Sequence, residues 1–115
     1  MKVLFLLNAS PYGSDKNYNA LRTAIHLQKQ NKEAQVFVYL MSDAVTSSIA
    51  GQKTKGDDYN TGEMLTQIMQ AGGQVKACTS CSESRGVTTL VTGAVMGTLT
   101  DLTDWITISD KVLTF

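Results

Sequence analysis

The chain has 115 residues, fewer than the roughly 150 of an average domain, so we expect a single domain over residues 1–115. Ten Lys and Arg residues balance ten Asp and Glu residues, which excludes a protein that binds nucleic acid through a densely basic face. Hydrophobic residues make up 43% of the chain and charged residues 17%, which excludes intrinsic disorder. The neutral net charge also removes the repulsion that keeps proteins apart, so we expect self-association.

Near its start the chain has a basic residue, Lys2, followed by a short apolar run, Val3–Leu7. This run is shorter than the roughly 7–15 apolar residues that a secretory signal needs. No stretch approaches the roughly 20 apolar residues that cross a bilayer, so we expect no membrane partner. Without a signal, the two cysteines, Cys78 and Cys81, indicate a reducing compartment, and we expect a cytoplasmic protein.

The first part of the chain predicts two strands on either side of a helix. Val3–Leu7 and Ala34–Met41 are continuous apolar runs, which are typical of strands buried on both faces of a parallel sheet. Between them, Ser14–Gln30 has apolar residues at helical spacing. Ser14 or Asp15 is expected to cap the start of this helix.

The middle of the chain continues the alternation of helix and strand. We interpret the stretch Gly51–Asp58, rich in Lys, Asp and Gly, as a lid or binding loop. Apolar spacing predicts a helix at Asn60–Ala71, in which Asn60 and Glu63 resemble a capping box. A third apolar run, Gln74–Cys78, predicts the next strand.

The last part of the chain predicts two more strands, at Ala94–Met96 and Lys111–Phe115, separated by a helix at Thr98–Ser109. Thr98 and Asp101 form a capping pair for this helix. The expected apolar face of the helix consists of Leu99, Leu102, Ile106 and the adjacent Trp105.

The regular alternation with short links predicts a doubly wound parallel α/β sheet of five strands. In such sheets ligands bind beyond the carboxyl ends of the strands, so the candidate site residues are those that follow the first three strands. The residues expected to bind a ligand are Asn8, Ser10, Tyr12, Ser42, Asp43 and Gly86. Asp43 is also expected to cap a short turn at Ala44–Ala50.

Two cysteines follow the third strand and are the most specific chemical feature. A thiolate is the reactive form of cysteine, and Arg85 is close enough in sequence to stabilise one at Cys78 if the loop at Thr79–Ser84 folds back. Cys81 could act as a resolving thiol that captures an oxidised or persulfidated Cys78 as a disulfide. The alternative is that Cys78 is a small buried side chain and Cys81 is incidental.

Other chemistries fit the residues less well. A zinc site needs three or four ligands, whereas the chain has two cysteines and one histidine, His26, on the polar side of its helix, so we expect no metal. A thioredoxin-type site would place the C-x-x-C at a helix start with a later cis-proline, but the only proline is Pro11. The Ser10–Ser14 loop leads into a helix and could hold an anion, which leaves a flavin or redox module as a weaker option; we expect no cofactor.

The chain resembles the DsrE family of sulfur-relay proteins, and within it the YchN-like branch. The motifs that carry the resemblance span the whole chain: Ala9-Ser10-Pro11-Tyr12-Gly13-Ser14, Leu40 to Val45, Val75-x-x-Cys78-x-x-Cys81, Arg85-Gly86-Val87, and Trp105 to Phe115. The resemblance implies a single-domain, flavodoxin-like three-layer fold with a mostly parallel five-stranded sheet. It also implies a hexamer, and for this branch a homohexamer.

In sulfur-relay relatives the cysteine that matches Cys78 accepts sulfane sulfur as a persulfide and hands it on, which implies the same role here, with protein donors and acceptors of sulfur. We therefore expect a persulfide carrier or sulfurtransferase-like protein in which Cys78 is the acceptor. The alternative is a non-catalytic oligomeric ring that binds a small ligand or a protein partner at its subunit interfaces.

Overall fold

The computed structural model describes residues 1–56 and 59–115, and contains a five-stranded sheet in the order β4-β3-β2-β1-β5. Every strand pairing in the sheet is parallel. The strands are β1 (Lys2–Leu7), β2 (Gln35–Leu40), β3 (Gln74–Cys78), β4 (Val95–Gly97) and β5 (Lys111–Thr114). The predicted fold class is confirmed, with a sheet that is all parallel rather than mostly parallel.

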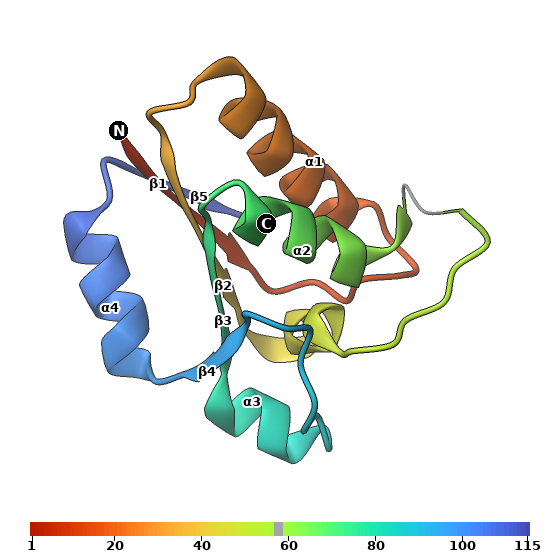
Figure 1. Cartoon of the computed structure of the whole chain (residues 1–115). Helices are drawn as coiled ribbons and strands as arrows, with labels where there is room; N and C mark the ends of the chain where they lie inside the picture. The colour runs from red at the N-terminus through yellow and green to blue at the C-terminus, as the bar shows by residue number, and fades with distance from the viewer. Residues whose placement is uncertain (57–58) are drawn as a thin grey trace.

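The helices form a layer on each face of the sheet and a group at its carboxyl end (Figure 1). Helices α1 (Lys16–Gln30) and α2 (Thr61–Gln70) pack against each other on one face, and α4 (Leu99–Ile108) lies on the other. The 3-10 helix η1 (Ser42–Ser48) and the short helix α3 (Thr79–Ser84) lie beyond the ends of β2 and β3. None of the helices within 1–56 and 59–115 has both the length and the apolar content to cross a membrane.

The central strands β1 and β2 lie in the middle of the core because helices cover both of their faces (Figure 1). Their buried side chains are Val3, Leu4, Phe5, Leu7, Val36, Phe37, Val38, Tyr39 and Leu40. The edge strands differ: Val112 and Leu113 of β5 are 40% and 39% exposed, and Val95 of β4 is also exposed. The expectation that all the apolar runs are buried on both faces is therefore wrong at the edges, because the helices on the two faces of the sheet do not fully cover the outer strands.

The predicted helix caps are confirmed at two of three helices. The Asn60 side chain accepts a hydrogen bond from the Glu63 N–H, and Thr98 and Asp101 form a complete capping box. At α1 the prediction is wrong, because Asp15 occupies the N-cap position but makes no side-chain cap. Its φ and ψ of -92° and 4° are not the extended angles that turn a capping oxygen toward the helix, and its carboxylate accepts from the Tyr59 hydroxyl instead.

Helix α4 buries a narrower face than its sequence predicts. Leu102 and Trp105 are buried, and the Trp105 ring stacks on Phe37 with the ring centroids 4.8 Å apart. Leu99 is 67% exposed and Ile106 is also exposed, contrary to expectation. One helix over a twisted sheet contacts it along a single line, so only the residues on that line are covered.

Helix α3 was not expected, since the sequence predicts a loop at Thr79–Ser84. The segment has only six residues, fewer than two helical turns, and contains Thr and Ser residues of low helix propensity. No periodic apolar pattern can appear over such a length. The C-x-x-C motif therefore lies at a helix start, whereas the sequence predicts a loop there.

Candidate functional site

The candidate site lies where β3 runs directly into α3. Cys78 is both the last residue of β3 and the N-cap residue of α3, and it is 9% exposed. The Thr79 hydroxyl donates a 2.8 Å hydrogen bond to the Gly97 carbonyl, which ties the start of α3 to the neighbouring strand β4. Gly97 pairs with Cys78 in the sheet register. The cysteine is thus held by two strands and a helix start rather than by a loose loop.

Gly97, the residue that pairs with Cys78, packs tightly against Lys76 and Tyr39. A Cβ atom there would lie 3.1 Å from the Lys76 Cβ and 3.1 Å from the Tyr39 ring. The Tyr39 hydroxyl donates to the Thr98 carbonyl at 2.7 Å. Any side chain larger than that of glycine at this position of β4 would therefore push on Lys76 and Tyr39.

The environment of the Cys78 thiol favours its ionised form. Burial acts to raise the pKa of Cys78, but hydrogen bonds from the side chains and backbone N–H groups of Ser80 and Cys81 lower it further than burial raises it. The Ser80 hydroxyl lies 3.4 Å from the Cys78 sulfur. The backbone N–H groups among these donors belong to the first turn of α3, where they have no partner within the helix. The thiolate that they favour is the form of cysteine that attacks sulfur.

Arg85 and Asp43 form an ion pair across the same edge of the sheet. The Arg85 Nε lies 2.8 Å from an Asp43 carboxylate oxygen, and its Nη1 donates to the Cys81 carbonyl at 3.2 Å. Asp43 therefore does not cap η1, whose N-cap is Met41 without a side-chain bond. The groups that lower the pKa of Cys78 are those of Ser80 and Cys81, and the guanidinium of Arg85 is engaged elsewhere.

Two residues in unusual backbone conformations flank this ion pair. Ser42, which precedes Asp43, has a φ of 52°, a left-handed value that residues other than glycine rarely adopt. Gly86, which follows Arg85, has a φ of 67° and ends α3. The backbone is thus bent sharply on both sides of the contact, which brings η1 and α3 together.

The β1–α1 loop forms a second polar cluster. The Ser10 hydroxyl donates to the Tyr12 carbonyl at 3.1 Å, and the Tyr12 hydroxyl bonds to the side chain of Gln52. The Thr61 hydroxyl donates to the same Gln52 oxygen at 2.8 Å. These bonds tie the loop to the start of α2 rather than to the cysteines. Asn8 is exposed, and its backbone N–H donates to the Phe115 carbonyl at 2.8 Å.

The structure therefore divides the predicted site residues into two clusters, and Asn8 belongs to neither of them. The first, which we call the cysteine cluster, consists of Cys78, Cys81, Arg85, Asp43, Ser42 and Gly86. The second, the tyrosine cluster, consists of Ser10 and Tyr12 with the newly recognised Gln52 and Thr61. Ser80 also went unrecognised, although a small hydroxyl residue between the two cysteines is a usable signal for thiolate stabilisation. Of the predicted lid, Gln52 packs into the tyrosine cluster, and residues 57–58 lie outside the described part of the chain.

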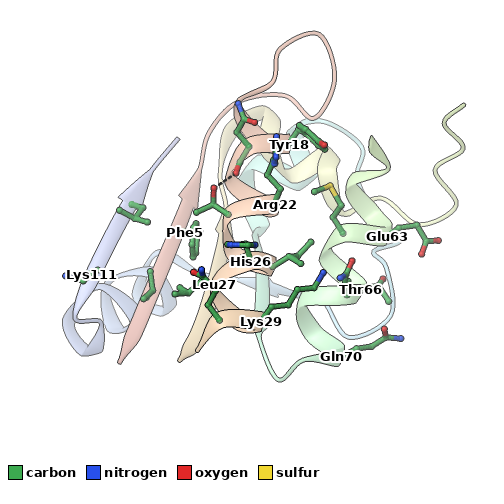
Figure 2. Close-up of a pocket in the computed structure, with 18 of the residues that line it drawn as sticks. Phe5, Tyr18, Arg22, His26, Leu27, Lys29, Glu63, Thr66, Gln70 and Lys111 are labelled. Carbon is green, nitrogen blue, oxygen red and sulfur yellow. Dashed lines mark hydrogen bonds between the residues drawn. The ribbon is translucent and has the colours of Figure 1, made fainter. Parts of the chain in front are cut away.

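A groove of about 1390 Å³ runs along the outer side of α1 (Figure 2). Its walls come from α1, from α2 and from residues of β1 and β5, and Arg22, His26 and Lys29 of α1 lie along it. His26 is exposed, as its position in the sequence predicts. No residue of the cysteine or tyrosine cluster lines this groove among the residues that the structure describes.

Comparison with known proteins places the chain in a family. A family model described as the DsrE/DsrF-like family matches residues 1–115. The protein YchN of Escherichia coli strain K12 is 41% identical over 116 residues, which cover 99% of this chain and 98% of YchN. An uncharacterised protein of Methanopyrus kandleri is 32% identical over 117 residues, which cover 98% of this chain and 93% of that protein.

Solved structures agree with the sequence comparison. The crystal structure of the YchN protein from E. coli matches with a TM-score of 0.94 at 40% identity, over 100% of this chain and 99% of that chain. A protein of unknown function from Methanobacterium thermoautotrophicum, at 13% identity and a TM-score of 0.76 over 99% of this chain and 98% of its own, shares the fold. The chain therefore belongs to the DsrE/DsrF-like family and is YchN-like within it.

Proposed function

We propose that the protein is a sulfane-sulfur carrier in which Cys78 accepts sulfur as a persulfide and hands it to an acceptor. The observation that carries this proposal is the position of Cys78: a nearly buried thiol at the start of α3, with its pKa lowered by hydrogen bonds from Ser80 and Cys81. Membership of a family named for sulfur-relay proteins supports the same chemistry.

The transfer needs two thiol-exchange steps. The Cys78 thiolate attacks the outer sulfur of a donor persulfide, so that Cys78 carries the S–SH group and the donor leaves as a thiolate. An acceptor thiolate then attacks that outer sulfur, and Cys78 leaves as a thiolate. The hydroxyl of Ser80 and the backbone N–H groups of Ser80 and Cys81 stabilise the sulfur anion in both steps.

Arg85 takes a positioning role in this proposal. Its bonds to Asp43 and to the Cys81 carbonyl hold the end of α3 against η1. We also propose a cytoplasmic location, because free cysteines persist in a reducing compartment.

The test is intact-mass spectrometry before and after treatment with inorganic polysulfide. Wild type and Cys81→Ser are expected to gain about 32 Da, the mass of one sulfur atom on a cysteine, and Cys78→Ser is expected to gain nothing. Equal sulfur loading of Cys81→Ser, which lacks the second thiol, and Cys78→Ser would overturn the proposal. Cys78→Ser is a near-isosteric change at a position with little exposed surface. A circular dichroism spectrum checks that the variant keeps its fold.

We further propose that the protein assembles with copies of itself, as a homohexamer. The exposed apolar side chains at the uncovered edges and on α4 support self-association: Val95, Leu99, Ile106, Ile108, Val112 and Leu113. Sedimentation velocity is expected to give a hexamer for wild type and smaller species for Leu113→Lys, while Glu33→Lys, on an exposed turn, stays hexameric. A wild-type monomer would contradict this assembly.

The groove along α1 favours a second candidate function, a non-catalytic ring that binds a small ligand or a partner at its subunit interfaces. The groove carries none of the cysteine cluster, so binding there would survive loss of both thiols. A Cys78→Ser/Cys81→Ser variant that retains a ligand bound by wild type supports the ring. Loss of binding in that variant supports the carrier.

A further inference from the structure

The positions of the two cysteines on α3 bring their sulfur atoms to the same end of the helix. Cys78 is the N-cap residue and Cys81 is the third residue of the helix. Side chains at these two positions turn toward each other, as they do in a capping box. Residues three apart on a helix have Cβ atoms roughly 5–6 Å apart, a small local shift from the roughly 3.5–4.5 Å of a disulfide. Both cysteines are free thiols.

Exposure separates the roles of the two cysteines. Cys78 is nearly buried, whereas Cys81 is half-buried on the first turn of α3. An acceptor from solvent meets the outer sulfur of a Cys78 persulfide first. A side chain at the third helical position turns toward the N-cap residue, and the Sγ of that residue, Cys78, is the inner sulfur. An interaction with the Cys81 side chain is also among those that lower the pKa of Cys78. Attack by Cys81 is therefore directed at the inner sulfur.

We infer that Cys81 discharges the loaded protein by attacking the Sγ of the Cys78 persulfide, which forms the Cys78–Cys81 disulfide and releases sulfide. This inference rests on the proposed function, since it requires the persulfide. The bond between the inner and outer sulfur breaks, and the new bond joins the two cysteine sulfurs. Cys81 attacks as the thiolate, after its thiol proton has passed to water, and the outer sulfur leaves with its own proton as HS⁻. Two electrons from the cysteine sulfurs reduce that outer sulfur to sulfide.

The internal disulfide must then be reduced before the protein can load again. A dithiol reductant, acting by thiol–disulfide exchange, supplies the two electrons and restores both thiols. The protein therefore delivers sulfane sulfur when an acceptor thiol arrives and sulfide when none does. Its place in a reaction sequence lies between a reaction that makes persulfide and a dithiol–disulfide exchange.

The first experiment tests the disulfide without any sulfur loading. Wild type is equilibrated in buffers of oxidised and reduced dithiothreitol and analysed by intact mass. The expected product is a protein about 2 Da lighter, with both thiols closed to maleimide and no covalent dimer. The matched control is Cys81→Ser/Ser84→Cys, which keeps two thiols but moves the second to the far end of α3, and it is expected to form no internal disulfide. If wild type forms covalent dimers or mixed disulfides but no internal disulfide, the inference is overturned.

The second experiment follows discharge after loading with inorganic polysulfide and removal of the excess. Wild type is expected to release one sulfide per persulfide and to end as the disulfide, whereas Cys81→Ser and the control variant hold the added sulfur at least about tenfold longer. Equal lifetimes in wild type and Cys81→Ser would overturn the inference while leaving the proposed function intact. If Cys81→Ser never gains sulfur, both the proposed function and this inference fail, even where the first experiment finds the disulfide.

Discussion

The guanidinium of Arg85 lies 2.8 Å from the carboxylate of Asp43, and this contact decides which groups act on the neighbouring thiol. The two residues are 42 positions apart and join η1 to the end of α3. The guanidinium thus receives its counter-charge from Asp43, and Cys78 receives its hydrogen bonds from Ser80 and Cys81. Arg85, which the sequence suggests as the cation beside the thiolate, instead joins the end of α3 to η1.

Ser80→Ala is expected to raise the pKa of Cys78. The substitution removes the hydroxyl 3.4 Å from the sulfur, and the hydrogen bond from this hydroxyl is the largest of the interactions that lower that pKa. The pH profile of iodoacetamide alkylation, measured in a Cys81→Ser background so that only Cys78 reacts, should move to higher pH. Alkylation at pH 7 should then slow several-fold. Ser84→Ala, at the other end of α3, is the control and should leave the profile in place.

Arg85→Gln is expected to change stability little and to leave the alkylation profile of Cys78 where it is. Both side chains of the Arg85–Asp43 pair are partly exposed, and exposed ion pairs contribute about 0.2–1 kcal/mol. Urea unfolding measures the stability of the variant, and the rate of alkylation as a function of pH measures the profile of Cys78. A profile moved to higher pH by Arg85→Gln, but not by Asp43→Asn, would show that Arg85 itself stabilises the thiolate.

Leu102→Ala and Leu99→Ala form a matched pair that tests which face of α4 is buried. Leu102 is 4% exposed and its truncation leaves a cavity against the sheet, with an expected loss of about 2–5 kcal/mol in the free energy of unfolding. Leu99 is 67% exposed in the single chain, and in a Leu113→Lys background, where the proposed assembly is expected to dissociate, the same truncation should cost no more than about 0.5 kcal/mol. Denaturant unfolding at one protein concentration compares the two variants. Equal losses in the free energy of unfolding would contradict the assignment of Leu102 to the buried face of α4.

Stability is expected to fall between about pH 10 and about pH 12 because of Tyr39. Burial, followed by the charges of Cys78, Asp101 and Cys81, raises the pKa of Tyr39 from 10.0 to about 12. Above pH 10.0 the unfolded chain therefore loses the phenolic proton while the folded protein keeps it, which favours unfolding as the pH rises.

Urea unfolding of wild type and Tyr39→Phe over this pH range measures the effect. The phenylalanine variant is less stable at neutral pH, since it lacks the hydroxyl bond to the Thr98 carbonyl. Its stability should nevertheless fall less steeply than that of wild type above pH 10. Parallel curves would show that Tyr39 titrates alike in the folded and unfolded states.

Local patterns in the sequence determined the elements of this protein and the position of its main cysteine. Continuous apolar runs predicted five strands, and Asn60 with Glu63 and Thr98 with Asp101 predicted two helix starts, because caps and periodicity involve residues within a few positions of each other. The placement of Cys78 at a carboxyl strand end follows from the same reasoning, since parallel strands all end at one edge.

Only the tertiary structure decided which side chains meet and which apolar runs are covered. The Arg85–Asp43 pair and the contact of Tyr12 with Gln52 join segments about 40 residues apart, and no local pattern encodes such contacts. Val112 is exposed although its strand reads as buried, because burial depends on whether another layer reaches the edge of the sheet. A six-residue helix at the cysteines is too short for periodicity, and its stability comes from its neighbours rather than from its own residues.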